Sequence, residues 1–368
     1  MSPAVSIKLH ALRLVAALLV VATHANQLGY TGSYHGVLEP LGRLGVIIFF
    51  VLSGYVIAHV SETRHHNLRS YMRARLGRLH SVLIPALLLT VLADLAGSSL
   101  EPGLYAGFPA VRNPSVLVTA PVFASFMYQS VGNGMRWLSN SPLWSIAYEF
   151  WYYVLFGTIV YLRGATRWVV VIGAACVCGL HILLLWPIWL AGVLLYRRRA
   201  RIAVITPRLA TLSGLLGVAI LTWLCLPTGF SALSGLREWG IRTIGQNFSA
   251  FLLWDLLLVI PICLTMVFVS HPRTTVIGSV VGTWIKSLAD GTFSIYCYHL
   301  PLLLLARATG FYVPASPIQA TLVAIAVVTI CLLLSTVTER RKRPWLRMWG
   351  RILQVEKPLE PYARTPAL

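Results

Sequence analysis

The sequence predicts an all-α protein, a polytopic membrane bundle of about ten transmembrane helices with both termini on the cytoplasmic side. Hydrophobic residues make up 57% of the 368 positions and charged residues only 11%, and the mean hydropathy is +0.74. Apolar runs near the length that spans ~30 Å of hydrocarbon recur along the chain. Because backbone polar groups must be bonded internally in lipid, such runs are expected to be helices.

Ten stretches fit a membrane-spanning helix: residues 9–27, 41–60, 82–98, 142–162, 168–180, 181–196, 208–226, 248–270, 288–306 and 318–337. Five basic clusters lie between or after these stretches, at residues 64–78, 163–167, 197–201, 271–273 and 340–343. An even number of spans places all five clusters on the cytoplasmic side, where Lys and Arg accumulate. The same parity favours two short helices over one long helix in residues 168–196, with a turn at Gly179.

The expected domain organisation is a transmembrane domain over residues 1–340 and a basic, amphipathic cytoplasmic tail over residues 341–368 with a disordered end. Residues 99–141 form a long outside connection, and connections of that length are commonly functional or disordered. Its apolar part, residues 116–128, is too short to span and is either a re-entrant piece or a surface helix.

The formal charge of +19 comes from 30 Lys and Arg against 11 Asp and Glu. Because these bases are dispersed between spans, they indicate membrane topology and lipid contact and disfavour nucleic-acid binding. The six cysteines lie in apolar surroundings without zinc-site spacing, so no metal is expected. The N-terminus lacks a clean cleavage pattern and is expected to be a retained first span of a multi-pass protein in the inner or plasma membrane.

Arg13 and His24 lie inside the first apolar stretch, where an ionisable side chain is costly and is a functional candidate by default. Eleven residues of helix give about 1100° of rotation and roughly 16 Å of rise, which places both on one face. His24 has the side chain most able to take a proton near neutral pH, as a general base for an alcohol must. The alternative is a structural histidine bonded to a neighbouring helix.

A basic segment from Tyr71 to Arg78 lies at the cytosolic end of a later span and contains Arg73, Arg75 and Arg78. We expect a loop there. Arg75 and Arg78 are three residues apart and can share a face that grips phosphate with forked donors. Ordinary positive-inside charge is the alternative.

Two further groups of polar residues lie within apolar stretches of the sequence. Glu149 lies among six aromatic residues, so it is expected to face a cavity or pair with a cation, and Ser145 precedes it by one helical turn. A Glu that ties two helices together is the alternative. In residues 291–301, Tyr296 and His299 precede Pro301, whose freed backbone carbonyl can bind a partner or ligand. A lone His299 is otherwise structural.

Five motifs follow one another along the chain. They are Arg13 followed by His24, the run 45–55, Arg75 with Arg78, Trp144 and Ser145 followed by Glu149, and Tyr296 with His299 and Pro301. Together they resemble the integral-membrane acyltransferase family 3, which includes O-acyltransferases of cell-surface sugars and macrolides. The resemblance covers nearly the whole chain.

This resemblance implies an acyl-CoA donor, acetyl-CoA in the first instance, that approaches from the cytosol, and an acceptor hydroxyl on a sugar or glycoside, with no permanently bound cofactor. It implies that His24 is the catalytic base and that Arg13, Arg73, Arg75 and Arg78 hold the donor. Glu149 would orient His24 or the acceptor, while Ser145, Tyr296 and His299 are candidate substrate contacts.

The residues leave two alternatives open. A relay would acylate a serine, Ser53 or Ser145, before transfer; it ranks below direct transfer because neither serine has an adjacent base in the sequence. A transporter or flippase would use the same buried charges to line a substrate or proton path.

Overall fold

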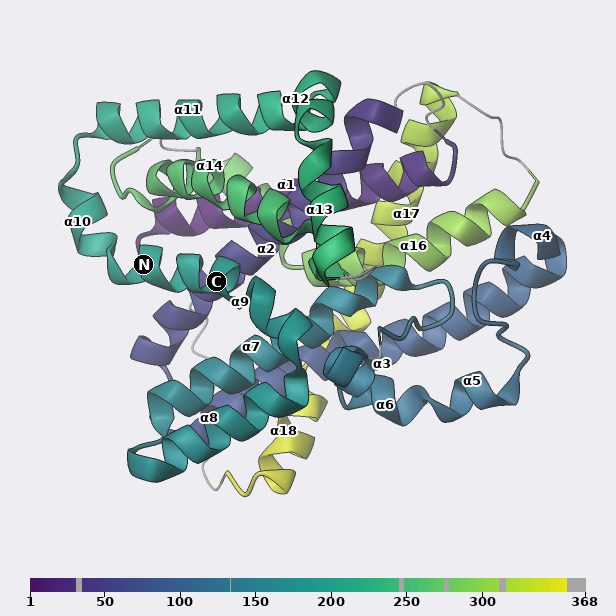
Figure 1. The fold of residues 1–368 in the computed structure, drawn as a ribbon, viewed down its shortest axis with the longest axis horizontal. Coiled ribbons are helices and arrows are strands. Elements are labelled where there is room, and N and C mark those ends of the chain that lie inside the picture. Colours follow the sequence, from purple (N-terminus) through teal and green to yellow (C-terminus); the bar gives the residue numbers. More distant parts are fainter. Residues whose placement is uncertain (31–34, 133, 245–247, 275–277, 311–315, 356–368) are drawn as a thin grey trace. The chain divides into compact units, whose positions relative to one another are not determined.

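The computed structural model describes residues 1–30, 35–132, 134–244, 248–274, 278–310 and 316–355, and no β-strand forms in these ranges (Figure 1). Seven helical segments are long and apolar enough to cross a membrane: Pro3–Gln27, Leu38–Thr63, Leu68–Leu100, Leu180–Arg197, Pro207–Cys225, Ser249–Ser270 and Pro317–Ile352. An eighth forms if α15 (Ser279–Ala289) and α16 (Thr292–Ala308) are one broken span. The chain is therefore an all-α, multi-pass membrane protein, as the sequence predicts, but the count of ten spans and the side of the termini are not confirmed.

The count differs at two of the expected spans. Residues 142–162 form α7 (Trp144–Tyr161), whose many Tyr and Trp residues and Glu149 lower its hydropathy. Residues 168–180 form α8 (Gly164–Cys178), which at 15 residues is only roughly 22 Å long. The turn expected at Gly179 is confirmed: α8 ends before it, its φ is +84°, and α9 (Leu180–Arg197) begins after it.

The chain divides into two compact units. Unit 1 comprises residues 1–27, 32–63 and 183–292. Its long helices are α1 (Pro3–Gln27), α2 (His35–Thr63), α11 (Pro207–Cys225) and α14 (Leu252–Ser270), with most of α9. Shorter helices are α10 (Arg199–Val204), α12 (Pro227–Ala232), α13 (Ser234–Ile244) and α15. Within unit 1, α11 runs alongside α14 (Figure 1).

Glycines let the helices of unit 1 approach at backbone distance. A Cβ on Gly45 of α2 would lie 2.6 Å from the Ala16 carbonyl oxygen of α1. Between α2 and α9, a Cβ on Gly54 would lie 2.0 Å from the Trp189 carbonyl oxygen, and one on Gly192 would lie 1.9 Å from that of Val51. The apolar run 45–55 is therefore a packing surface for two neighbouring helices, which only residues without side chains can bring this close.

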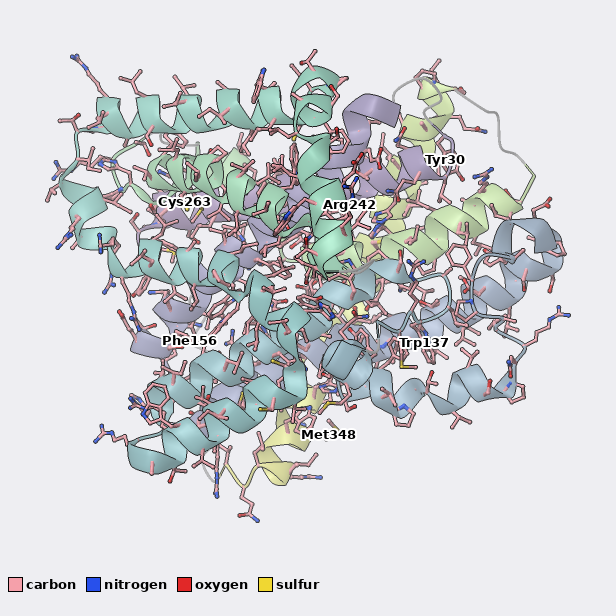
Figure 2. All side chains as sticks on the ribbon, viewed as in Figure 1. Tyr30, Trp137, Phe156, Arg242, Cys263 and Met348 are labelled. Carbon is pink, nitrogen blue, oxygen red and sulfur yellow. The ribbon has the colours of Figure 1, made fainter. Side chains whose placement is uncertain are left out.

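Unit 2 comprises residues 28–31, 64–182 and 293–368. Its longest helix is α3 (Leu68–Leu100), followed by α4 (Pro102–Tyr105), α5 (Pro114–Val118), α6 (Ala120–Ala124), α7, α8, nearly all of α16, α17 (Pro317–Val337) and α18 (Arg343–Ile352). The connection 99–141 is thus a series of short helical pieces. Trp137, labelled in Figure 2, is almost fully buried and donates from Nε1 to the Leu87 carbonyl of α3 at 3.1 Å.

The helix α18 forms part of the expected tail and packs on α3. Leu346 fills the space over Gly77, where a Cβ would lie 2.6 Å from a Leu346 methyl carbon. The His80 ring stacks on Trp345 with centroids 6.1 Å apart and also contacts Trp349. Residues 356–368, expected to be disordered, lie outside the described residues.

Candidate active site

The helix α1 carries Arg13 and His24 on one face. It runs without interruption from Pro3 to Gln27, so the helical rotation expected between the two residues holds, and they are roughly 16 Å apart along the axis. Both side chains are half-buried. On the same helix, Gly42 and Gly45 of α2 pack against Thr23 and Ala16, which holds this part of α1 against α2.

A hydrogen bond sets the tautomer of His24. Its Nδ1 lies 3.0 Å from the Val20 carbonyl oxygen, one turn earlier in α1. A carbonyl can only accept, so Nδ1 carries the proton and the neutral ring has its lone pair on Nε2. The same bond restrains the ring orientation, since Val20 is in the helix backbone. In the neutral form of His24, Nε2 is thus the basic nitrogen.

The basic segment 71–78 is helical, and the expectation of a loop there was wrong. Asn67 caps α3 by accepting a hydrogen bond from the Ser70 backbone N–H at 2.8 Å, so the helix begins at Leu68. Asn is among the best N-cap residues because its side-chain oxygen satisfies an otherwise unpaired backbone donor. The arginines are therefore on a rigid helix.

The three arginines of α3 have different surroundings. Arg73 is buried and donates from Nε to the Leu346 carbonyl oxygen at 3.0 Å, which ties α18 to α3. Arg75 is 9% exposed, and its guanidinium carbon lies 5.8 Å from the centre of the Tyr71 ring. Arg78 lies over the Phe293 ring at 6.0 Å.

Arg75 lies beside the rings of Tyr71 and Tyr153, where, in the part of the chain that the structure describes, buried hydrogen-bond donors are left without acceptors. Among the described residues, the Arg75 Nε and the Tyr71 hydroxyl are buried without a hydrogen-bond partner. Burial of a donor without an acceptor is costly, so such groups point to a ligand or water. The aromatic faces suit a guanidinium, which stacks on rings as well as pairing with anions.

Glu149 joins the same cluster through Tyr153. The Tyr153 hydroxyl donates to Glu149 Oε1 one turn earlier in α7. The Tyr153 ring centre lies 6.0 Å from the guanidinium carbon of Arg75. The structure therefore brings Glu149 and Arg75 into one group of residues in unit 2, with Tyr153 between them.

Ser145, Tyr296 and His299 form a second group in unit 2. The Ser145 Oγ and the Tyr296 hydroxyl are 2.6 Å apart, and the Tyr296 hydroxyl donates to the Pro142 carbonyl at 3.0 Å. His299 is fully buried, and its Nδ1 lies 3.0 Å from the Ile295 carbonyl and 2.9 Å from that of Tyr296. The two bonds of the Tyr296 hydroxyl hold α16 against the start of α7, while those of His299 lie within α16.

The residues chosen from the sequence belong to both units. Arg13 and His24 are in unit 1, and the other seven are in unit 2: Arg73, Arg75, Arg78, Ser145, Glu149, Tyr296 and His299. Among the residues that the structure describes, no group of three or more His, Cys, Asp or Glu could hold a metal ion.

Comparison with known proteins decides the family. A family model described as an acyltransferase domain matches residues 6–336. The chain belongs to acyltransferase family 3. An O-acetyl transferase of Shigella phage Sf6 is 28% identical over 170 residues, which are 44% of this chain and 48% of the relative, so the match spans about half the length of that protein. No solved structure matches the chain.

The acyltransferase has a buried ion pair that sequence reasoning missed. Arg43 of α2 donates from Nε to Asp255 Oδ1 of α14 at 2.7 Å and pairs through Nη2 with Oδ2. Asp255 is fully buried, and the guanidinium carbon also lies 5.1 Å from the Phe251 ring centre. The signal was present, because Asp255 is a carboxylate within the apolar stretch 248–270.

A second unforeseen network joins α2 to α9 in unit 1. The Tyr196 hydroxyl donates to Glu62 Oε2 at 3.0 Å and therefore accepts from His59 Nδ1, which lies 3.1 Å away. Arg199 donates to the same Glu62 oxygen at 3.0 Å and lies over the Tyr196 ring. These four residues lie near the ends of their helices, far apart in the sequence. The sequence alone therefore could not predict which of them pair with one another.

Proposed function

We propose that this family member is an O-acyltransferase that moves an acyl group, acetyl in the first instance, from acyl-CoA to a hydroxyl of a sugar or glycoside. It works in the inner or plasma membrane, in contact with lipid, and uses acyl-CoA as a substrate without a bound cofactor. Family membership and the partial likeness to an O-acetyl transferase support this reaction class. The tautomer of His24 supports it most directly at the level of residues.

His24 is the general base of this proposal. Its Nδ1 donates to the Val20 carbonyl, so Nε2 is the nitrogen that accepts the proton of the acceptor hydroxyl. The bond to the helix backbone also stabilises the ring after it gains a proton, because a charged donor makes the stronger hydrogen bond. This division of roles between the two ring nitrogens is what a histidine base requires.

The arginines of α3 and Arg13 hold the donor. Arg75 and Arg78 are on a rigid helix, and the unpartnered Arg75 Nε and Tyr71 hydroxyl are buried donors suited to the phosphate oxygens of the acyl donor. Arg73 has a positioning role in this proposal, because its Nε already binds the Leu346 carbonyl. Arg13 shares a face of α1 with His24 and contributes positive charge.

Transfer is direct in this mechanism. The acceptor oxygen attacks the thioester carbonyl carbon while His24 Nε2 takes the hydroxyl proton. The new C–O bond forms as the C–S bond breaks, and the CoA thiolate leaves and recovers the proton from the imidazolium. The products are an ester and free CoA thiol, so atoms and charge balance without a further reactant.

The remaining site residues orient these groups. Glu149 accepts from Tyr153 beside Arg75, which places a carboxylate where it can orient the arginine that holds the donor. Ser145 and Tyr296 hold α16 against α7, and His299 is bonded to the backbone of α16 itself, so these three residues support the substrate site in this proposal. A serine relay through Ser53 has less support, because its Oγ accepts a bond from Trp189 Nε1 at 3.1 Å.

The test is thiol release by the purified full-length protein from acetyl-CoA with a glycoside present. We expect His24→Ala to lower turnover by about 10²–10⁴-fold, the usual contribution of a general base. Exogenous imidazole should restore part of the loss, which a purely structural histidine would not allow. His10→Ala, a buried histidine on the same helix, is the matched control and should retain turnover.

Two results would contradict the proposal. Unchanged turnover in His24→Ala removes His24 as the base. Movement of a glycoside across proteoliposomes with the thioester left intact identifies a transporter, because transport alone does not consume acetyl-CoA.

A further inference from the structure

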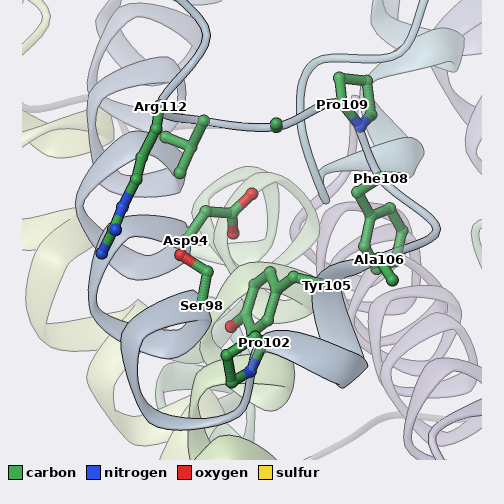
Figure 3. Close-up of a pocket in the computed structure, with 10 residues that line it drawn as sticks. Asp94, Ser98, Pro102, Tyr105, Ala106, Phe108, Pro109 and Arg112 are labelled. Carbon is green, nitrogen blue, oxygen red and sulfur yellow. The ribbon is translucent and has the colours of Figure 1, made fainter.

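The C-terminal end of α3 and the short helix α4 surround a cavity of about 350 Å³ in unit 2. Its lining includes Asp94 and Ser98 of α3, Tyr105 of α4, and Phe108, Val111 and Arg112 of the segment that follows. This volume is at the lower end of the range of roughly 300–1,000 Å³ for small-molecule sites. Figure 3 shows the Asp94 carboxylate and the Tyr105 ring pointing into one space, with Phe108 and Arg112 on opposite sides.

We propose that this cavity binds the acceptor as a neutral glycoside, with Asp94 and Tyr105 bonding its hydroxyls and Tyr105 and Phe108 packing on its ring. This inference rests on the proposed function, because it names the place and class of the acceptor. The donor arginines are elsewhere on the same helix.

The Tyr105 hydroxyl is a buried group without a use in the fold. It has no hydrogen-bond partner among the described residues, and Tyr105 is 8% exposed. Burial, with the nearby Asp94 and Tyr30, raises the pKa of Tyr105 above its ordinary value, so the phenol keeps its proton and can donate. An unpaired buried hydroxyl at a cavity wall is most simply satisfied by a ligand oxygen.

The structure makes room for this hydroxyl. A Cβ on Gly97 of α3 would lie 1.9 Å from the Tyr105 hydroxyl oxygen, so only glycine lets the phenol approach the helix here. Tyr105 also packs on Leu304 and Ala308 of α16 with Phe108 partly buried against them, which fixes the ring. The Tyr105 and Phe108 ring centres are 6.5 Å apart.

Asp94 supplies an oriented hydrogen-bond acceptor in the lining of the cavity. Its Oδ2 accepts from the Ser139 backbone N–H at 2.9 Å and its Oδ1 from the Ser139 hydroxyl at 2.6 Å. A carboxylate has about four lone-pair sites, so each oxygen can accept another hydrogen bond from a sugar hydroxyl. The carboxylate repels an anionic sugar, while Arg112 at the other side is bonded to Ser99 Oγ at 2.8 Å.

The cavity is separated from the donor arginines along α3. Arg75 and Asp94 are nineteen residues apart on one helix, which is roughly 28 Å. That is close to the ~30 Å hydrocarbon thickness of a bilayer. The two ends of α3 therefore lie near opposite membrane faces, so the acceptor enters from the face away from Arg75.

The test measures glycoside binding by the purified full-length protein in nanodiscs, without acyl donor. The probe is methyl α-D-glucopyranoside, followed by saturation-transfer difference NMR and calorimetric titration. We expect Tyr105→Phe to weaken binding by about 2- to 10-fold, the range for one neutral hydrogen bond, and to leave thermal stability unchanged or raised. Phe108→Ala should also weaken binding. Tyr128→Phe is the matched control, because it removes a hydroxyl that is bonded to the Leu143 carbonyl. This variant should keep the wild-type affinity for the glycoside.

The outcomes separate this inference from the proposed function. The cavity assignment is overturned if Tyr105→Phe and Phe108→Ala leave glycoside binding unchanged. It is also overturned if the wild-type protein does not bind the glycoside. Transfer that still depends on His24 would then show that the acyltransferase reaction stands and the acceptor binds elsewhere. Tighter binding of methyl α-D-glucuronide than of the glucoside would overturn the neutral class.

Discussion

Asn140 donates from Nδ2 to the Cys297 carbonyl oxygen at 2.9 Å. Cys297 is four residues before Pro301 in α16, and the proline has no N–H to donate to that carbonyl. The carbonyl that the proline was expected to free thus has its partner in the connection 99–141. The same Asn140 amide also donates to Thr90 of α3 at 2.9 Å. One amide therefore joins two helices of unit 2.

This bond predicts coupling between Asn140 and Pro301. Asn140→Ala should lower the free energy of unfolding by about 1–3 kcal/mol, because the Cys297 carbonyl and Thr90 hydroxyl lose their donor in a buried place. In a Pro301→Ala background the loss should be smaller, since the substituted alanine supplies the helical N–H to Cys297. Denaturation of the four proteins in one detergent measures the coupling, and additive losses would show that the proline plays no part.

The Arg43 and Asp255 ion pair predicts an asymmetric response to mutation. Arg43→Leu alone should destabilise the protein by about 3–5 kcal/mol, because it leaves a fully buried carboxylate without its partner. The double variant Arg43→Leu, Asp255→Leu should recover most of that loss, since neither charge remains. Thermal denaturation of both variants gives the comparison. A double variant less stable than Arg43→Leu would mean that the pair itself is strongly stabilising.

His65 predicts a loss of stability in acid. Burial, with the positive charges of Arg75, Arg64 and His66, lowers the pKa of His65 to about 4 from 6.5. As the pH falls from 6.5 towards 4 the unfolded chain gains a proton that the folded protein does not, so stability decreases over that window and is flat below it. The ring contacts Tyr71 with centroids 5.9 Å apart.

The measurement is the unfolding midpoint between pH 4 and pH 7.5 for the wild type, His65→Gln and His66→Gln. His65→Gln should lose this part of the pH dependence. The exposed neighbour His66 is the control, and its variant should keep the wild-type slope. Equal slopes in all three proteins would contradict a buried neutral His65.

The contact between α2 and α9 predicts intolerance of any side chain at Gly192. In Gly192→Ala the new Cβ would lie 1.9 Å from the Val51 carbonyl oxygen, and a backbone atom cannot rotate away. The helices must separate, which should cost about 1–3 kcal/mol or more. Gly173→Ala in α8 is the matched control: no atom lies within 4 Å of its Cβ, so we expect a gain of about 0.5–1 kcal/mol. Unfolding midpoints that rise in both variants would refute the close contact.

Composition and spacing were enough for the fold class and for most of the long helices. The turn at Gly179 followed from charge parity, and the helical spacing of Arg13 and His24 followed from the apolar run around them. Element ends were less predictable. The Asn67 cap marks the start of α3 at Leu68. Residues Arg73 to Arg78, which were expected in a loop, are therefore helical.

By itself, the sequence determined which residues are chemically able to act: a histidine within an apolar helix, a group of arginines and one carboxylate among aromatic rings. These are properties of residue type and hydropathy, which are local. Only the tertiary structure decided the partners, as in Arg43 with Asp255, Asn140 with Cys297, and Tyr105 with Gly97. Such contacts join residues distant in the chain, and their energies depend on burial and geometry that no single segment carries.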